Sequence, residues 1–388
     1  MSKGSSAYPL ILDISRLVWR VWRGRHPTGI DRVCLAYVEQ FQDRALAVVQ
    51  RKGFLLVLSQ RQSKKLFKLL LRGREVSKRE LVQALAAAIL TGRRVPPAQG
   101  MLYLNVGHTG LNDRALADWV SRSETRAVHL IHDLIPITNP EFCRPGEAEK
   151  HRERIANALE SASGIISNSR ATLDELAGFA ADRTVPMPQS VVAWIAGVDQ
   201  SGDVQPKVLE RPYFVAVGTI EARKNHLMLL QAWRLLVAEL GDGAPILVIV
   251  GQAGWEAEET LGILDHPGIL KGHVRQVEDC GDAELMNWIA GARALLMPSF
   301  AEGFGLPVVE ALSLGTPVIA SNLTVFREIA GGIPTYLSPS DGNAWGQAIR
   351  SFSGSSPERD RQLSAIGGYE APTWSKHFEI VESWMSKL

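Results

Sequence analysis

Short apolar segments alternate with turns and helical patterns along most of this chain. Segments that are apolar at nearly every position are typical of parallel strands covered on both faces. They lie at residues 10–14, 54–58, 101–105, 127–131 and 164–167 in the first half, and at 213–218, 245–251, 294–297 and 317–320 in the second. Amphipathic helical stretches such as 227–240 lie between them. The pattern predicts an α/β protein with two doubly wound parallel sheets.

A polar, glycine-bearing stretch at residues 197–206 separates the two series of strands. A chain of 388 residues is long for a single hydrophobic core. We therefore predict an N-terminal domain at 1–198, a C-terminal domain at 199–372 and a closing helix at 373–388. Ligands of doubly wound folds bind outside the carboxyl ends of the strands, so the site is expected in a cleft between the domains.

Composition narrows the classes of protein to consider. Apolar residues make up 46% of the chain and charged residues 21%, as in an ordered globular protein. The net charge of +1 gives no indication of nucleic-acid binding. Cys34, Cys143 and Cys280 are far apart, which favours reduced thiols over disulfides. No run is long enough to span a membrane and the N-terminus lacks a signal-peptide pattern, so we expect a cytoplasmic protein.

Residues 298–312 combine a glycine-broken loop, a helix start and two acids, Glu302 and Glu310. Glycines let backbone approach a ligand, and the free amides at a helix N-terminus suit a phosphate. Carboxylates on both sides can accept hydrogen bonds from the hydroxyls of two sugar rings. The segment predicts a nucleotide-sugar site, in which the donor-binding positions are Gly303, Phe304, Gly305, Leu306 and Glu310.

A second segment, residues 218–226, places Arg223 and Lys224 at the start of the predicted helix 227–240. The helix dipole disfavours cations there unless an anion binds with them. These side chains can hold a diphosphate and the negative charge that grows on it as a sugar leaves. We predict that both act in catalysis.

These segments resemble a known family. Residues 298–312 are similar to the E-x7-E motif of the retaining glycosyltransferases of family 4, and the likeness continues through residues 315–322 and 326–329. Residues 218–226 resemble the "VGTxEPRKN" element of its mannosyltransferase-like members, with Ala222 in place of proline. Thr219 stands where an arginine is common, which leaves Arg223 as the candidate guanidinium. The resemblance implies the GT-B fold, two Rossmann-like domains facing across a cleft.

Further site residues follow from the resemblance. His132 closes strand 127–131 like the family's "HD" strand end, which implies contact with the donor sugar near its reacting carbon, with Asp133 as a candidate orienter. Gly29 resembles the family's glycine loop, in which Thr28 replaces the first glycine. The backbone of Val274 is assigned to the base, although a plain strand at 269–274 is the competing interpretation. His108 is a rival candidate on the acceptor side.

Basic and aromatic residues gather in the first half of the chain. A basic amphipathic helix can lie on an anionic membrane close to a lipid-linked acceptor, or it can simply present a solvated face, and both interpretations stay open. The residues are Arg16, Trp19, Arg20, Trp22, Arg23 and Arg25, and then Lys64, Lys65, Lys68, Arg72, Arg74, Lys78 and Arg79.

Together with these residues, the resemblance implies a retaining glycosyltransferase that moves a hexose from a nucleoside diphosphate sugar to a saccharide or lipid-linked acceptor, in bacterial surface polysaccharide synthesis. GDP-mannose is the first donor to test. No Asp-x-Asp triplet occurs, so we expect no obligatory metal and no other cofactor. A sugar-nucleotide epimerase on the same fold and a non-catalytic relative are the alternatives.

Overall fold

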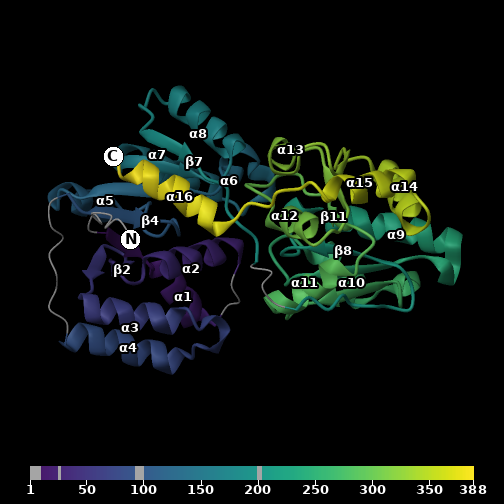
Figure 1. The fold of residues 1–388 in the computed structure, drawn as a ribbon, viewed down its shortest axis with the longest axis horizontal. Coiled ribbons are helices and arrows are strands. Elements are labelled where there is room, and N and C mark those ends of the chain that lie inside the picture. Colours follow the sequence, from purple (N-terminus) through teal and green to yellow (C-terminus); the bar gives the residue numbers. More distant parts are fainter. Residues whose placement is uncertain (1–9, 25–27, 92–99, 199–202) are drawn as a thin grey trace. The chain divides into compact units, whose positions relative to one another are not determined.

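The computed structural model describes residues 10–24, 28–91, 100–198 and 203–388. They form two compact units, each described here by itself (Figure 1). The described residues of Met1–Ile137, with Gly146–Ile195 and Trp374–Leu388, form the N-terminal unit, and those of Thr138–Pro145 and Ala196–Thr373 form the C-terminal unit. The border at Ile195 and Ala196 precedes the predicted one, and 138–145 joins the C-terminal unit, which the sequence did not indicate. Within the predicted linker, 199–202 lies outside the described residues.

In the residues described, the N-terminal unit has one seven-stranded sheet of order β3-β2-β1-β4-β5-β6-β7. Neighbouring strands are parallel except β2 and β3. The strands are β1 (Leu10–Asp13), β2 (Ala45–Arg51), β3 (Phe54–Val57), β4 (Leu102–Asn105), β5 (Arg126–Ile131), β6 (Ala162–Ser167) and β7 (Gln189–Val192). The helices are α1 (Ser15–Arg23), α2 (Gly29–Phe41), α3 (Gln60–Leu70), α4 (Lys78–Thr91), α5 (Arg114–Arg122), α6 (Ile135–Thr138), α7 (Glu147–Ser161), α8 (Arg170–Asp182) and α16 (Trp374–Met385), with short 3-10 turns η1 (Gly73–Glu75) and η2 (Pro140–Phe142).

Within the described part of the C-terminal unit, six parallel strands follow the order β10-β9-β8-β11-β12-β13. The strands are β8 (Tyr213–Val217), β9 (Ile246–Val250), β10 (Val274–Val277), β11 (Leu295–Met297), β12 (Val318–Ser321) and β13 (Thr335–Leu337). The helices are α9 (His226–Leu240), α10 (Glu258–Asp265), α11 (Asp282–Ala290), α12 (Leu306–Ser313), α13 (Thr324–Ala330), α14 (Gly342–Ser353) and α15 (Pro357–Ile366), with η3 (Ala222–Lys224), η4 (Gly241–Gly243) and η5 (Gly268–Leu270).

In each sheet the order in which the chain adds strands reverses at one place. This place lies between β1 and β4 in the N-terminal unit and between β8 and β11 in the C-terminal unit. Such a switch point opens a crevice at the carboxyl ends of the two strands, because their connections leave toward opposite sides. The predicted doubly wound α/β architecture is confirmed for both units. This topology decides which loops of each unit can share a ligand.

Several sequence expectations about single strands were wrong. β3 runs antiparallel to β2, because a tight turn at Lys52 and Gly53, both with positive φ, joins them as a hairpin. Strands β2, β7, β10 and β13 were not predicted. The expected strand at 269–274 is instead the 3-10 turn η5 followed by a glycine turn, and β10 begins only at Val274.

Helix α16 packs on the N-terminal unit (Figure 1). The hydroxyl oxygen of Tyr37 on α2 lies 2.8 Å from Nε2 of His377, and Nδ1 of His377 lies 3.1 Å from the Trp194 carbonyl oxygen. A carbonyl can only accept, so Nδ1 carries the proton and Nε2 accepts from Tyr37. Phe378 packs against the rings of Tyr37 and Phe41. No helix within the described residues is long and apolar enough to cross a bilayer.

Candidate functional site

The switch point of the C-terminal unit brings the two predicted donor segments together. Residues 218–225 leave the carboxyl end of β8 and residues 298–305 leave that of β11, its neighbour in the sheet. The backbone amide of Phe300 donates to the carbonyl of Arg223 at 2.9 Å, and Nδ2 of the Asn225 side chain donates to the carbonyl of Pro298 at 3.2 Å. One backbone hydrogen bond and one from the Asn225 side chain therefore hold the two loops side by side.

Four charged side chains meet in these loops. Lys224 Nζ lies 2.5 Å from Glu302 Oε1, and Arg223 Nη1 lies 3.1 Å from Glu302 Oε2. Arg223 also pairs with Glu221 at 2.7 Å and donates to the Ala301 carbonyl at 2.7 Å. The Ser299 hydroxyl donates to Glu302 at 2.7 Å. Both oxygens of Glu302 are thus fixed, and a guanidinium and an ammonium lie side by side, as binding of a diphosphate requires.

The local charges set the ionisation of this cluster. Burial alone would raise the pKa of Glu302, but attraction to Lys224 and Arg223 and its hydrogen bonds outweigh burial and lower the pKa to about 2. Burial lowers the pKa of Lys224, and the Glu302 carboxylate opposes that change. The direct ion pair at 2.5 Å indicates that both groups are charged. A bound anion would therefore meet a cation pair already oriented by Glu302.

The glycine loop leads into α12 through a left-handed residue. Gly305 has a φ of 108°, and a β-carbon there would lie 2.6 Å from the ring of Phe326. Only glycine fits this position without strain. Gly303 and Phe304 precede Gly305, and Leu306 begins α12. Because α12 follows β11, its first backbone amides lie at the carboxyl edge of the sheet, where the sequence predicted a phosphate site.

Glu310 lies one turn into α12 and is 1% exposed. Its Oε1 accepts from the backbone amide of Val198 at 3.3 Å, and a β-carbon on Gly197 would lie 2.6 Å from its Cγ. Glu302 thus precedes α12 and Glu310 lies within it, and the binding roles of the two acids stay predictions. The contact with residues 197 and 198, which begin the predicted linker, was not predicted.

In the N-terminal unit, the two rival histidines are neighbours. His132 follows β5 and His108 follows β4, and their ring centroids lie 5.0 Å apart. His132 Nε2 lies 2.8 Å from the Val106 carbonyl, and His108 Nε2 lies 2.8 Å from the Leu130 carbonyl. Burial lowers the pKa of His132 to about 4 and that of His108 well below 6.5. Both rings are therefore neutral at physiological pH, with Nε2 protonated.

The predicted partnership between His132 and Asp133 is not observed. Asp133 Oδ1 accepts from the Ile135 amide at 3.2 Å, so it closes the next turn, and the Val106 carbonyl orients the His132 ring instead. A backbone carbonyl leaves no mark in the sequence, which is why the prediction chose the adjacent acid.

Sequence reasoning missed two other side chains beside these histidines. The His151 ring lies 6.3 Å from that of His108, and Arg154 donates to His151 Nδ1 at 3.0 Å and to Asn112 at 3.0 Å. Both sit on α7, one turn apart, where they read as an ordinary charged helix face. Only the amphipathic placement of α7 against the sheet could have indicated them.

Thr28 and Gly29 start α2, where the structure shows a helix cap. Thr28 Oγ1 donates to Asp31 at 2.7 Å, and the Thr28 amide donates to the same carboxylate at 2.7 Å. Buried Asp31 also pairs with Arg16 at 2.8 Å and Arg20 at 2.6 Å. The φ of Gly29 is not positive, so the backbone conformation does not require glycine there. The local geometry is explained by capping, and a binding role for Thr28 and Gly29 stays a prediction.

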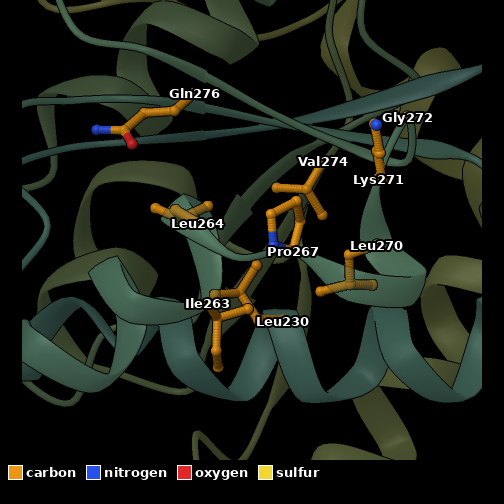
Figure 2. Close-up of a pocket in the computed structure, with 9 residues that line it drawn as sticks. All are labelled: Leu230, Ile263, Leu264, Pro267, Leu270, Lys271, Gly272, Val274 and Gln276. Carbon is orange, nitrogen blue, oxygen red and sulfur yellow. The ribbon is translucent and has the colours of Figure 1, made fainter.

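Val274 does not lie with the other donor candidates. It is the first residue of β10 and pairs with Leu247, whereas the carboxyl end of β10 is Val277, which pairs with Val250. In a parallel sheet, this places Val274 at the edge opposite to Gly218 and Glu302, so its assignment to the base was wrong. Figure 2 shows where it lies instead, in a cavity of 180 Å³ lined by Leu230, Ile263, Leu264, Pro267, Leu270, Lys271, Gly272, Val274 and Gln276.

In the described part of the chain, no group of three or more His, Cys, Asp or Glu side chains is placed to hold a metal ion. The metal requirement of the protein stays a prediction. The chemistry that the C-terminal cluster offers comes from its own Arg223 and Lys224.

Residues 199–363 match the family model described as "Glycosyl transferases group 1". The O-antigen chain mannosyltransferase B of Escherichia coli is 33% identical over 232 residues, which cover 56% of this chain and 59% of that protein. The serotype-specific mannosyltransferase WbdA of the same organism is 30% identical over 234 residues, covering 55% of this chain and 28% of WbdA. The chain therefore spans less than two thirds of the length of these relatives.

The crystal structure of Anabaena HepE in complex with UDP resembles this fold across both units. The TM-score is 0.66 at 16% sequence identity, and the match covers 98% of this chain and 99% of HepE. At this identity the likeness shows the fold alone, and it confirms the GT-B fold class predicted from the sequence.

Proposed function

Since residues 199–363 match the family model described as "Glycosyl transferases group 1", we propose that the protein is a retaining glycosyltransferase. It would move a hexose from a nucleoside diphosphate sugar to a saccharide or lipid-linked acceptor, in the synthesis of a bacterial surface polysaccharide. The observation that carries this proposal is the contact of Arg223 and Lys224 with Glu302 at the β8–β11 switch point.

The two cations would stabilise the leaving diphosphate. Negative charge grows on its oxygens as the bond to the sugar breaks, and Arg223 and Lys224 are oriented before the substrate arrives. Removal of one such donor typically costs about 2.7–4 kcal/mol of transition-state stabilisation. Glu302 can accept hydrogen bonds from sugar hydroxyls while it holds both cations in place, and Glu310 would bind the ribose.

The N-terminal unit would supply the remaining groups. A neutral His132, with its pKa near 4, can contact the sugar near its reacting carbon as a hydrogen-bonding group without adding charge. In a retaining reaction of this kind the acceptor attacks from the face that the diphosphate leaves, and an oxygen of the diphosphate takes its proton. No separate carboxylate base is then required.

The donor is proposed to be GDP-mannose, because two of the relatives are named as mannosyltransferases. The reaction is proposed to need no metal, because two protein cations already occupy the place where the diphosphate charge would fall. The acceptor is proposed to be a glycan reached at the inner face of the cytoplasmic membrane. An epimerase and a non-catalytic nucleotide-sugar-binding protein are the alternatives.

One assay separates these three functions. Purified protein is incubated in EDTA with GDP-mannose or UDP-sugars, with and without acceptor glycans, and nucleotide release is followed. We expect release that depends on both GDP-mannose and acceptor and that persists in EDTA. An isomerised sugar nucleotide without acceptor would identify an epimerase, and binding without turnover a non-catalytic relative. Release that stops in EDTA and returns with Mg²⁺ would overturn the metal-independent mechanism.

A further inference from the structure

Charge is distributed very unevenly along this chain. Residues 44–91 contain eleven Lys and Arg and only two acids, a net charge of +9, whereas the whole chain carries +1. This excess lies between β2 and the end of α4, in the N-terminal unit. It is separate from the cation pair of the donor site, which lies in the C-terminal unit.

Helix α3 presents the largest group of these cations. Its inner face buries Leu66, Phe67 and Leu70 in the core, so its other face must point to solvent. That outer face is formed by the exposed side chains of Arg61, Lys64, Lys65 and Lys68, spaced three or four residues apart. Lys64 has a surface partner in Asp43 at 3.1 Å. Residues 44–91 contain only two acids, Glu75 and Glu80, so this outer face is strongly positive.

Helix α4 lies beside α3 (Figure 1). It exposes two large apolar side chains. Leu81 and Ala88 are buried, which fixes the rotation of the helix. Val82, which is 42% exposed, and Ile89, which is 61% exposed, directly follow these two residues and so share one flank of the helix, about 100° around from the buried face. Exposed apolar side chains of this kind gain nothing from water, and α4 packs against α3, the helix that carries the cations.

An aromatic seam extends this surface from α4 to α1 and β2. Lys78 at the start of α4 lies 5.7 Å from the ring centre of Trp22, which is 42% exposed. Trp22 lies 6.5 Å from Trp19, and the Arg51 guanidinium lies 4.4 Å from the Trp19 ring. Tryptophan flanked by Lys and Arg is typical of side chains at the boundary between water and a lipid bilayer.

We propose that this surface, formed by the outer faces of α3 and α4 with Trp22, docks on an anionic lipid bilayer. The cations of α3 would meet lipid phosphates while Val82, Ile89 and Trp22 enter the headgroup boundary. The proposal needs both the cations and the exposed apolar side chains, because a face that only contacts water would have no reason to expose apolar side chains. A nucleic acid would satisfy the cations and leave Val82 and Ile89 in water. The docking itself does not depend on the proposed function. Only its purpose, to bring the site to a lipid-linked acceptor, rests on that function.

The test measures binding of the full chain to vesicles by co-sedimentation, without any substrate. Wild type is expected to bind vesicles of phosphatidylglycerol and phosphatidylcholine far more tightly than phosphatidylcholine alone. The triple variant Lys64→Gln, Lys65→Gln and Lys68→Gln is expected to weaken binding to anionic vesicles about 100-fold, since each cation near such a surface contributes roughly 5-fold. The matched control changes three exposed cations of the C-terminal unit, Arg234, Lys271 and Arg275, to Gln and should bind like wild type.

A second variant tests the exposed apolar side chains. Val82→Gln with Ile89→Gln keeps every charge, and it should lower binding most clearly at high salt, where the electrostatic attraction is screened. The proposal is overturned if the triple variant and its control weaken equally, or if wild type binds an RNA of equal charge more tightly than anionic vesicles. Because binding needs no catalysis, a protein that docks on vesicles but transfers no sugar would refute only the proposed function.

Discussion

Glu302 links the two halves of the donor cluster at the scale of single residues. It pairs with Lys224 at 2.5 Å and with Arg223 at 3.1 Å, and Ser299 fixes the same carboxylate. The three charges are interdependent, because each cation is partly neutralised by the acid until an anion arrives. Sequence reasoning assigned Glu302 to the sugar and the cations to the diphosphate, and it did not foresee their direct contact.

Substitution of Lys224 tests this cluster. Lys224→Ala is expected to lower kcat/KM for the sugar donor about 100- to 1000-fold, because one donor to the leaving diphosphate is lost. Glu302 keeps Arg223 as a partner, so the melting temperature should change little. Glu302→Ala should also reduce turnover strongly, since both cations lose the acid that positions them.

The matched control for this prediction is Lys271→Ala, an exposed cation of the same unit. It should leave kcat/KM unchanged. Near-normal turnover of Lys224→Ala would remove this residue from the mechanism.

Helix α12 shows what a single backbone position contributes at the scale of one element. The helix has eight residues and begins directly after Gly305. Gly305 turns the chain with a φ of 108° and lies against the ring of Phe326. Pro at the second helical position then favours the helix without needing an amide partner. The glycine pattern 303–305 was readable from the sequence, but the ring that excludes a side chain was not, because Phe326 lies on α13.

Gly305→Ala is expected to lower both the free energy of unfolding and the donor affinity. The new methyl group would need an unfavourable positive φ and would lie within 2.6 Å of Phe326, so the loop must shift. Thermal unfolding and a titration with nucleotide sugar measure the two effects.

Gly262→Ala is the matched control within α10, where a β-carbon meets nothing within 4 Å. Alanine there should raise the free energy of unfolding by about 0.5–1 kcal/mol, because it removes glycine's entropy cost in a helix. If both variants behave alike, Gly305 has no special role at the start of α12.

At the scale of the whole molecule, the last helix of the chain belongs to the first unit. Helix α16 is separated from α2 by more than three hundred residues, yet Tyr37 and His377 share a hydrogen bond in a buried site. His377 also contacts the carbonyls of Ala193 and Trp194, just before the border between the units. The packing of α16 therefore links the start, the middle and the end of the sequence within the N-terminal unit.

This contact predicts a stability that depends on pH. Burial lowers the pKa of His377 from 6.5 to about 4, so the unfolded chain binds a proton more readily than the folded one. The stabilisation is fully present above pH 6.5 and is lost as the pH falls toward 4. At pH 5 it is smaller by about 2 kcal/mol than at pH 8.

The variant His377→Gln isolates this effect, since glutamine can hydrogen-bond but does not titrate. Between pH 8 and pH 5 it should lose about 2 kcal/mol less of its unfolding free energy than wild type, measured by urea denaturation. Parallel losses in both proteins would show that the other buried histidines, and not His377, control acid stability.

Much of the fold and of the donor site could be predicted from the sequence. Apolar strand periods, the glycine loop 303–305 and the acids Glu302 and Glu310 are local signals, because strand burial, turn geometry and helix starts depend on neighbouring residues. They were sufficient to predict two doubly wound units and the segments that the β8–β11 switch point brings together.

Only the tertiary structure decided which groups contact one another. It moved Val274 to the opposite edge of its sheet, replaced Asp133 by the Val106 carbonyl as the partner of His132, and joined α16 to the first unit. It also showed that α3, which exposes cations, and α4, which exposes apolar side chains, pack against each other. Contacts of this kind depend on strand direction, backbone carbonyls and helix rotation, which emerge only when distant segments pack.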